Sequence, residues 1–336
     1  MRTRQYSPSL IFFGTSEFGA IVLEKLVEHH FRPVLVVTTP DRPAGRGQKL
    51  AMPPVKTAAL AHRISLAQPE KIADIREDIH KLQPDLIILA AYGKFLPPSI
   101  LSLSKFGPLN VHPSLLPKFR GPSPIQSAIL EEVDTTGVSI MLMDEEIDHG
   151  PLIAQEPFSL FNREFRDGKG KPTYAELHDQ LAQQGGNLLA DTIPKWMSQQ
   201  IQPQEQNHAQ ATLTKRFTKE DGHIDWKSPA GYIERQVRAF QPWPGAFGQM
   251  ALKHQKANLA STEQKPKILK ILRANTREYD RAKQPGLTFR ADDGSIEIQT
   301  GKGMLAVQEI QLEGKKSAHA RDFLLGYPDI IGTILT

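Results

Sequence analysis

Short apolar runs alternate with helix-like patterns through the first half of the chain. The strand-like runs lie at residues 9–13, 34–37, 86–91, 107–111 and 137–143, and a helical pattern lies at 124–130. The run at 86–91 is almost wholly apolar, which is typical of a strand buried on both faces of a parallel sheet. Strands that alternate with helices predict an α/β fold, with a doubly wound, mostly parallel, Rossmann-like sheet covered by helices on both faces.

The pattern changes in the last third of the chain. Residues 198–210 are rich in glutamine and contain Pro203, which is typical of an exposed linker. Short alternating apolar runs then recur at 246–252, 267–272, 295–299 and 304–312. Two domains are also the default for a chain of 336 residues. We therefore expect a first domain at 1–197, a linker at 198–210 and a small, OB-like C-terminal β-barrel at 211–336.

Composition narrows the class of protein. With 39% hydrophobic and 23% charged residues the chain is expected to be globular, and the lack of cysteine excludes disulfides and thiolate metal sites. Its apolar runs are too short to span a bilayer, and the first residues lack the apolar stretch of a signal peptide. We expect a cytoplasmic protein that does not associate with a membrane.

Positive charge is concentrated toward the C-terminus. The net charge is +4, but residues 211–336 hold 20 Lys and Arg against 14 Asp and Glu, whereas residues 1–210 hold 21 against 23. This excess favours an anionic partner, such as nucleic acid, in contact with the C-terminal part. A solvated basic face is the alternative interpretation.

Candidate chemistry begins at Asn110 and His112. Two residues that are two positions apart on an extended backbone project from the same side, so this amide and this imidazole can face one point. Such a pair suits acyl transfer, because both groups can donate to an oxygen that becomes negative and the imidazole can carry a proton. The alternative is a polar strand end with a hydrogen-bonded histidine.

Acidic residues follow the next strand. Asp144 and Asp148 lie just past its end, where a carboxylate can reach a site built by the neighbouring strand. A carboxylate beside an imidazole would orient the ring, and it could take a proton from an attacking amine. The alternative is a solvated acidic loop.

Two further segments could hold a ligand. Pro113 and Pro117 stiffen the backbone around Ser114, Leu115 and Leu116, where a flat ligand could lie. Tyr92 ends a buried strand at the edge where a ligand pocket would open.

Two glycine-containing segments are candidates for phosphate binding. Gly14 and Gly19 lack the spacing of a dinucleotide site and no P-loop lysine follows them, so we expect no nucleotide cofactor. The segment 41–50 is a loop rich in glycine, proline and positive charge, in which Arg42, Arg46 and Lys49 could reach phosphates. A mobile surface loop is the alternative there.

With these residues taken together, the chain resembles the methionyl-tRNA formyltransferases, a family within the folate-dependent formyltransferase superfamily. The resemblance covers nearly the whole chain, through motifs at 40–50, 91–93, 110–117, 120–121, 143–144, 148–150, 225–226, 238–244 and 314–316. Asn-x-His with Ser-Leu-Leu-Pro and a later Asp is specific to the superfamily. The basic loop and the C-terminal barrel single out the tRNA enzymes.

The resemblance implies that residues 1–197 form the catalytic domain of an enzyme that transfers the formyl group of the co-substrate 10-formyltetrahydrofolate to the amino group of initiator methionyl-tRNA. The amine would attack the formyl carbon directly, through a tetrahedral intermediate, and the product would serve translation initiation. The residues that the family's pattern matches are Asn110, His112 and Asp148 for catalysis, Ser114, Leu115, Leu116, Pro117, Tyr92 and Asp144 for folate, and Arg42, Arg46 and Lys49 for tRNA. No metal is implied, and we expect a monomer.

Three other functions stay open at this point. A formyltransferase that acts on a nucleotide-linked amino sugar would keep the same three catalytic residues but would not need the basic loop. An RNA-binding module with an inactive enzyme-like half is a second alternative. An NAD-dependent oxidoreductase is a third, and the spacing at Gly14 weighs against it.

Overall fold

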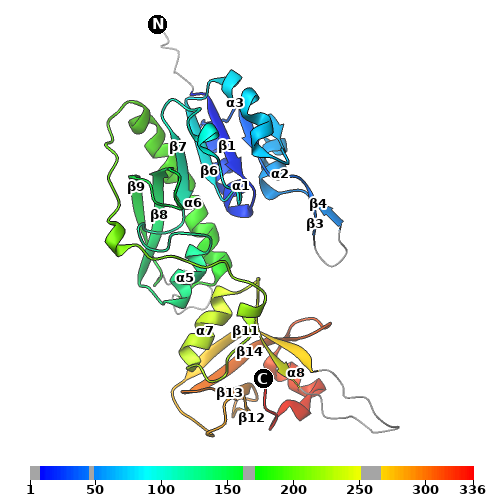
Figure 1. The fold of residues 1–336 in the computed structure, drawn as a ribbon. Coiled ribbons are helices and arrows are strands. Elements are labelled where there is room, and N and C mark those ends of the chain that lie inside the picture. Colours follow the sequence, from blue (N-terminus) through cyan, green and yellow to red (C-terminus); the bar gives the residue numbers. More distant parts are fainter. Residues whose placement is uncertain (1–7, 45–48, 162–170, 251–265) are drawn as a thin grey trace. The chain divides into compact units, whose positions relative to one another are not determined.

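The computed structural model describes residues 8–44, 49–161, 171–250 and 266–336 of the chain (Figure 1). The chain folds into two compact units. The N-terminal unit comprises Met1–Pro124, Asp134–Lys171 and Glu176–Lys215, and the C-terminal unit comprises Ile125–Val133, Pro172–Ala175 and Arg216–Thr336. The division near Lys215 falls shortly after the predicted linker, whose residues are mostly exposed except for the buried Gln206.

A seven-stranded sheet forms the centre of the N-terminal unit, with the strand order β5-β2-β1-β6-β7-β8-β9. The strands are β1 (Leu10–Gly14), β2 (Leu35–Val37), β5 (Leu66–Ala67), β6 (Leu86–Ala90), β7 (Pro108–His112), β8 (Thr135–Leu142) and β9 (Leu152–Ser159). The five strands from β5 to β7 in this order pair in parallel. Strands β8 and β9 are antiparallel to their neighbours. This confirms the predicted doubly wound, mostly parallel sheet.

Helices pack on both faces of this sheet. In the N-terminal unit they are α1 (Glu17–Glu28), α2 (Pro54–Ala61), α3 (Arg76–Leu82), α4 (Pro98–Leu101) and α6 (Tyr174–Met197). Helix α5 (Pro124–Leu130) falls, apart from Pro124, in the C-terminal unit. On one face Ile79 of α3 and Ile100 of α4 join the buried cluster that contains Phe13 of β1. On the other face α6 approaches closely, because a Cβ on its Gly185 would lie 2.8 Å from a methyl group of Val111 in β7. Each buried Leu or Ile in such a core contributes roughly 1.5 to 3 kcal/mol.

The glycines of the first turn allow close packing. A Cβ at Gly14 would lie 2.9 Å from the carbonyl oxygen of Ala90 in β6, and a Cβ at Gly19 would lie 2.5 Å from the same oxygen. The turn between β1 and α1 therefore needs small residues to rest against β6. This packing role explains the spacing of these glycines without a nucleotide.

The basic segment that was expected to be a loop forms a small hairpin. Strand β3 (Arg42–Ala44) pairs with β4 (Lys49–Ala51) in an antiparallel manner, with Arg42 opposite Ala51. Strands this short leave no readable alternation in the sequence, which is why the pattern did not predict them. Residues 45–48, which include Arg46, lie outside the described residues.

The C-terminal unit is built on an antiparallel sheet with the strand order β10-β11-β14-β13-β12, and β15 pairs with β14. Its strands are β10 (Ala246–Met250), β11 (Lys267–Arg277), β12 (Thr288–Arg290), β13 (Ile296–Gln299), β14 (Met304–Leu312) and β15 (Ala318–His319). Helices α7 (Ala230–Ala239) and α8 (Ala320–Gly326) pack against it, and Trp226, Ile233 and Leu305 belong to their shared core. This architecture is consistent with the predicted small barrel.

Four short 3-10 helices complete the described elements, at Ile72–Ile75, His208–Gln210, Glu220–Gly222 and Pro328–Ile330. Within the described part of the chain, no helix has the length and apolar character needed to cross a bilayer.

Candidate active site

The three predicted catalytic side chains meet in the N-terminal unit. Asn110 and His112 lie on β7, with side chains on the same face, and Asp148 lies in the loop after β8. Asn110 Nδ2 donates to Asp148 Oδ1 at 3.3 Å, and His112 Nδ1 lies 3.6 Å from Asp148 Oδ2. The side chains of His112 and Asp148 are only 6% and 15% exposed. An amide, an imidazole and a carboxylate are thus assembled in one largely buried group.

Asp148 reaches this group by a route that the sequence did not indicate. It lies past the end of β8, as expected, but the residue pattern does not reveal that β8 runs antiparallel to β7, so that Leu142 at its end pairs with Leu109 near the start of β7. Met143 N–H then donates to the carbonyl of Pro108 at 2.9 Å, and the following loop folds back toward Asn110. Asp148 itself has φ 49°, a left-handed conformation that costs an ordinary L-residue roughly 1 to 2 kcal/mol and must be supported by its surroundings.

The orientation of the His112 ring follows from its two partners. Its Nε2 lies 2.9 Å from the carbonyl oxygen of Phe119, which can only accept a hydrogen bond, so Nε2 carries a proton. The other nitrogen, Nδ1, therefore faces Asp148. The ring is held in one tautomer and one orientation by a backbone group, as is common for functional histidines.

The Asp148 carboxylate also accepts from the backbone. Gly121 N–H donates to Asp148 Oδ2 at 2.7 Å. Gly121 has φ 101°, and a Cβ at this position would lie 3.0 Å from both the carbonyl and the hydroxyl oxygen of Thr214. Glycine is needed here for the backbone conformation and for the close approach.

The predicted folate loop is fastened to the sheet by its own backbone groups. Ser139 Oγ of β8 accepts from Leu116 N–H at 3.1 Å and donates to the carbonyl of Ser114 at 2.6 Å. Gln155 Nε2 of β9 donates to the carbonyl of Leu116 at 2.9 Å. Ser114 Oγ donates to the carbonyl of Lys118 at 2.6 Å, and Pro117 follows Leu116 through a cis peptide bond. These hydrogen bonds hold the loop beside His112 against β8 and β9, whereas its stiffness and its contact with folate stay predictions.

Tyr92 and Asp144, the other predicted folate residues, make contacts of their own. The Tyr92 ring is 1% exposed and packs edge-to-face on Phe13 with centroids 5.3 Å apart, and burial raises the pKa of its hydroxyl. Asp144 Oδ2 lies 2.7 Å from His149 Nδ1. Next to Tyr92, Gly93 has φ 77° and open space where a Cβ would be. A ligand at this strand end would meet backbone and open space at Gly93 before it met the Tyr92 ring.

The predicted tRNA residues that the structure describes lie on the β3–β4 hairpin. Arg42 Nη2 lies 2.7 Å from Glu70 Oε2 with both side chains exposed, and Lys49 is exposed. At the base of the hairpin, Asp41 accepts from Gln68 Nε2 at 2.8 Å and from Lys56 Nζ at 2.7 Å. These bonds, that of Gln68 first, lower the pKa of Asp41 below its usual value. The hairpin is anchored at its base, and its cationic residues are open to solvent.

Sequence reasoning missed several groups around Asp148. The Gly121 N–H and the Phe119 carbonyl are backbone groups, which residue types do not reveal. Arg120 and Gln206 are buried and bonded to each other, although the sequence indicates Arg120 only as part of a motif and Gln206 only as part of a linker. The one available signal was the Arg-Gly dipeptide at 120–121.

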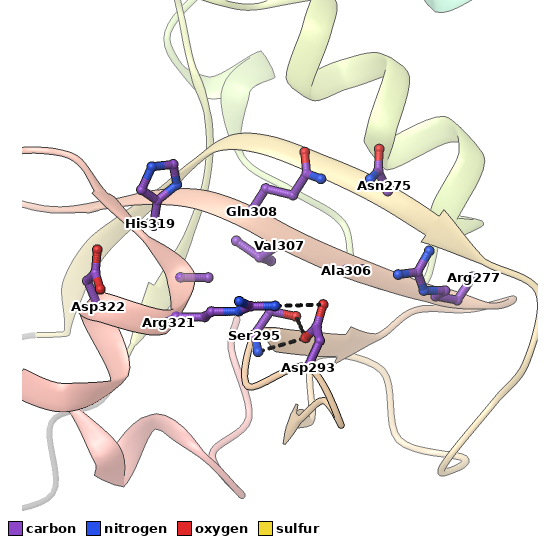
Figure 2. Close-up of a pocket in the computed structure, with 11 residues that line it drawn as sticks. Asn275, Arg277, Asp293, Ser295, Ala306, Val307, Gln308, His319, Arg321 and Asp322 are labelled. Atoms are coloured by element: carbon purple, nitrogen blue, oxygen red, sulfur yellow. Dashed lines mark hydrogen bonds and ion pairs between the residues drawn. The ribbon is translucent and has the colours of Figure 1, made fainter. Parts of the chain in front are cut away.

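The C-terminal unit holds a separate pocket of about 400 Å³ (Figure 2). Two guanidinium groups and two carboxylates line it, from Arg277, Arg321, Asp293 and Asp322. Hydrogen bonds from Ser295 lower the pKa of Asp293, and the nearby guanidinium groups lower it further. Because carboxylates offset the positive charge, this pocket is not a strongly basic patch, and contact of the C-terminal unit with an anionic partner stays a prediction.

Among the residues that the structure describes, no group of three or more His, Asp or Glu side chains is arranged to hold a metal ion.

Comparison with known families agrees with this geometry. A family described as "Formyl transferase" matches residues 9–193, and one described as "Formyl transferase, C-terminal domain" matches residues 216–328. The chain is 38% identical to the methionyl-tRNA formyltransferase of Chloroflexus aurantiacus, over 94% of this chain and 96% of that protein. It is also 38% identical to that of Pelobacter propionicus, over 98% of this chain and 96% of that protein.

The chain belongs to the methionyl-tRNA formyltransferase family. The resemblance found in the sequence is thereby confirmed, as is the expectation of a transferase.

Solved structures show how widely the fold of this family is shared. HypX from Aquifex aeolicus, solved in complex with tetrahydrofolic acid, matches 96% of this chain with a TM-score of 0.59 and 16% identity, and this chain spans about half of its length (47%). An N-formyltransferase from Helicobacter canadensis, in complex with folinic acid and dTDP-3-aminofucose, matches 89% of this chain and 99% of its own, with a TM-score of 0.60 and 18% identity. At these identities the likeness concerns the fold alone.

Proposed function

We propose that this protein transfers the formyl group of 10-formyltetrahydrofolate to the amino group of initiator methionyl-tRNA, in the cytoplasm, for translation initiation. The proposal follows the family to which the chain belongs. The chemistry is supported by one observation: in a largely buried group, Asp148 Oδ1 lies 3.3 Å from Asn110 Nδ2, and Asp148 Oδ2 lies 3.6 Å from His112 Nδ1. An amide donor, an oriented imidazole and a carboxylate are what direct attack of an amine on a formyl carbon requires.

Asn110 is proposed to stabilise negative charge on the formyl oxygen. Its amide has two N–H groups, and one of them donates to Asp148 Oδ1 at 3.3 Å. This contact fixes the amide plane, so the second N–H is held ready for an oxygen that becomes negative. A donor that is fixed in advance in a site that excludes water costs no reorganisation during the reaction.

His112 and Asp148 are proposed to complete the oxygen site and to manage protons. Because the Nε2 proton is donated to the carbonyl of Phe119, Nδ1 is the nitrogen that can take up a proton, and in the resulting imidazolium it can donate to the formyl oxygen. Asp148 Oδ2, 3.6 Å from Nδ1, can accept the proton that the attacking amine loses. That proton then passes to the nitrogen of tetrahydrofolate as its bond to the formyl carbon breaks, which regenerates the carboxylate. With these groups in place no covalent enzyme nucleophile is needed.

The residues near this group suit a folate co-substrate. The loop from Ser114 to Pro117 offers Leu115, Leu116 and Pro117 next to His112 and is hydrogen-bonded to β8, and Gly93 leaves open space at the end of the neighbouring strand β6. Asp144 offers a carboxylate, 37% exposed, that could accept from ring N–H groups. The co-substrate would supply the formyl carbon, and these residues would hold its ring system.

The β3–β4 hairpin is proposed to contact the acceptor end of the tRNA. Arg42 and Lys49 are exposed on it, and Arg46, in the undescribed part, completes the predicted set. Exposed cations on an anchored hairpin can reach phosphates that are remote from the buried catalytic group. The C-terminal unit, with its basic composition, would support the flank of the tRNA.

A substrate comparison tests the proposal. The protein is incubated with 10-formyltetrahydrofolate and, in parallel, methionylated initiator tRNA, methionylated elongator tRNA or a dTDP-linked amino sugar. We expect rapid formylation of the initiator tRNA, slower formylation of the elongator tRNA and none of the sugar. Formylation of the sugar alone would favour the amino-sugar alternative, and no transfer to any acceptor would overturn the proposal.

A further inference from the structure

Asp148 is held from its backbone side by a single buried side chain. Its carbonyl oxygen accepts a hydrogen bond of 3.0 Å from Gln206 Nε2, which also donates to the carbonyl of Gly150 at 2.7 Å. The Gln206 amide therefore spans the turn in which Asp148 takes its left-handed conformation. Gln206 is 58 residues away in sequence and only 4% exposed.

The other end of Gln206 is fixed by Arg120. Gln206 Oε1 accepts from Arg120 Nε at 3.1 Å and from Arg120 Nη2 at 2.7 Å. Because a guanidinium group can only donate, the oxygen of the amide must face Arg120 and its NH₂ group must face the Asp148 turn. Arg120 Nη2 also lies 2.9 Å from His208 Nδ1, which accepts for the same reason. The amide thus has only one orientation that satisfies all of its partners.

Arg120 is also adjacent to the backbone group that binds the Asp148 carboxylate. Arg120 directly precedes Gly121, whose N–H donates to Asp148 Oδ2 at 2.7 Å. The Arg120 backbone is itself clamped, since its N–H donates to the carbonyl of Thr212 and its carbonyl accepts from Thr214 N–H. A closed ring of contacts results, from the Asp148 carbonyl through Gln206 and Arg120 to Gly121 and back to the Asp148 carboxylate.

We propose that Gln206, oriented by Arg120, is a positioning residue that aims the Asp148 carboxylate at Asn110 and His112. It does not touch the reacting atoms and acts only through Asp148, so the inference rests on the proposed catalytic role of Asp148. The segment that composition marked as a linker thereby becomes a structural part of the active site. Small displacements of a catalytic carboxylate are costly, because the productive geometry tolerates little misplacement.

The variant Gln206→Glu tests this with little change in volume. It keeps an oxygen for Arg120 but turns a second oxygen, in place of the NH₂ group, toward the carbonyls of Asp148 and Gly150. We expect kcat to fall roughly 10- to 100-fold while KM for the formyl donor and for methionyl-tRNA stays within about threefold, because binding groups are untouched. The variant Gln206→Asn, which restores a shorter amide, is expected to regain part of this loss.

Gln236 provides a matched control. Its Nε2 donates to the carbonyls of Asp221 and His223, at 2.9 and 3.3 Å, and it is 6% exposed in the C-terminal unit. Gln236→Glu thus removes the same kind of buried amide contact from a turn without catalytic residues. We expect a comparable loss of thermal stability with kcat within about twofold of wild type. Equal kcat losses in the two variants would show a merely structural role and would overturn the proposal.

A double-mutant cycle separates positioning from an independent effect. In the Asp148→Asn background, Gln206→Glu should lower kcat by less than about threefold further, since the carboxylate through which it acts is gone. The same fold-loss in both backgrounds overturns the proposal. If Gln206→Glu does not fold, Arg120→Lys replaces it in the cycle, because lysine keeps the charge but loses the double hydrogen bond to Gln206. Its effect on kcat should likewise be smaller in the Asp148→Asn background.

Failure of the inference and failure of the proposed function give different results. Full turnover in Asp148→Asn would overturn the catalytic role of Asp148 and this inference with it. An impaired Asp148→Asn beside a fully active Gln206→Glu would overturn the inference alone.

Discussion

The proposed catalytic group around Asp148 and the β3–β4 hairpin differ in how their side chains are held. Asn110, His112 and Asp148 are largely buried, and several backbone and side-chain groups fix their orientation. On the hairpin, Arg42 and Lys49 are exposed, Arg42 forms a solvent-exposed ion pair with Glu70, and Asp41 at the base is bonded to Gln68 and Lys56. On the proposed assignment, chemistry depends on a buried, hydrogen-bonded arrangement, whereas recognition of a large anionic substrate depends on solvated charges. Mutations in the two regions should affect different kinetic parameters.

The largest expected effect is loss of the buried donors. Asn110→Ala or His112→Ala should each lower turnover by roughly 100- to 1000-fold, about 3 to 4 kcal/mol of barrier, because each removes a group that faces the developing charge. Affinity for the formyl donor should stay near that of wild type. Steady-state kinetics with direct measurement of folate binding checks this, and full turnover in either variant would remove that residue from the mechanism.

A smaller loss is expected when the backbone donor is displaced. Gly121→Ala places a Cβ 3.0 Å from Thr214 oxygens and strains a φ of 101°, so its N–H should move away from Asp148 Oδ2. Hydrogen bonds to charged groups contribute about 1.5 to 3 kcal/mol, which corresponds to a turnover loss of roughly 10- to 100-fold. Gly332→Ala is the control, since Gly332 has φ 77° and nothing within 4 Å of a Cβ. If both variants lose turnover equally, backbone strain rather than the carboxylate contact is the cause.

The sequence predicted the first of these regions better than the second. The alternation of side chains along β7 was enough to place Asn110 and His112 on one face. The apolar run at 86–91 was enough to predict the buried strand β6. The direction of β8 was not readable, because β8 is buried on both faces and therefore lacks the alternation that often marks an antiparallel strand. The structure places Asp148 after β8 and beside Asn110 and His112, as the sequence led us to expect, whereas the antiparallel direction of β8 was not predicted and the catalytic role of Asp148 stays a prediction.

Contacts between distant segments were beyond sequence reasoning. Gln206 lies 86 residues from Arg120, in a stretch whose glutamine-rich composition is typical of linkers, and its burial results only from the closure of the fold. The donors and acceptors at Gly121 and Phe119 belong to the backbone, which every residue possesses. Their roles depend on conformation rather than on residue type.

On the hairpin we expect moderate effects that are confined to the tRNA. Arg46→Ala and Arg42→Ala should lower kcat/KM for methionyl-tRNA several-fold and reduce the dependence of log K on log salt by about 0.7 to 0.9 per lost phosphate contact. Slow hydrolysis of the formyl donor should be unchanged. Arg76→Ala is a matched control for Arg42, because Arg76 is also exposed and pairs with a glutamate, at 2.6 Å against 2.7 Å. Equal loss of transfer and hydrolysis would contradict the division of roles.

The smallest effect is expected at the base of the hairpin, as a function of pH. The pKa of Asp41 is lowered by its bonds to Gln68 and Lys56, so its ionised form stabilises the folded state. This contribution is fully present above the usual value of 3.8 and is lost as the pH falls through the lower value of the folded protein. Hydrogen exchange of the β3 and β4 amides should accelerate below that pH in wild type. In Asp41→Asn it should already be faster at neutral pH, and unchanged exchange in that variant would remove Asp41 as the anchor.

The central claim is that an amide, an imidazole and a carboxylate act together on one formyl group. Its most direct test is the single-turnover rate of formyl transfer to initiator methionyl-tRNA in Asn110→Ala, His112→Ala and the double variant. Mutations of groups that act as a unit have strongly non-additive effects on the rate. We therefore predict that the double variant is no more than about tenfold slower than the slower of the two single variants. Losses that multiply to the full product of the two single effects, or a double variant that transfers formyl groups at the wild-type rate, would contradict the account.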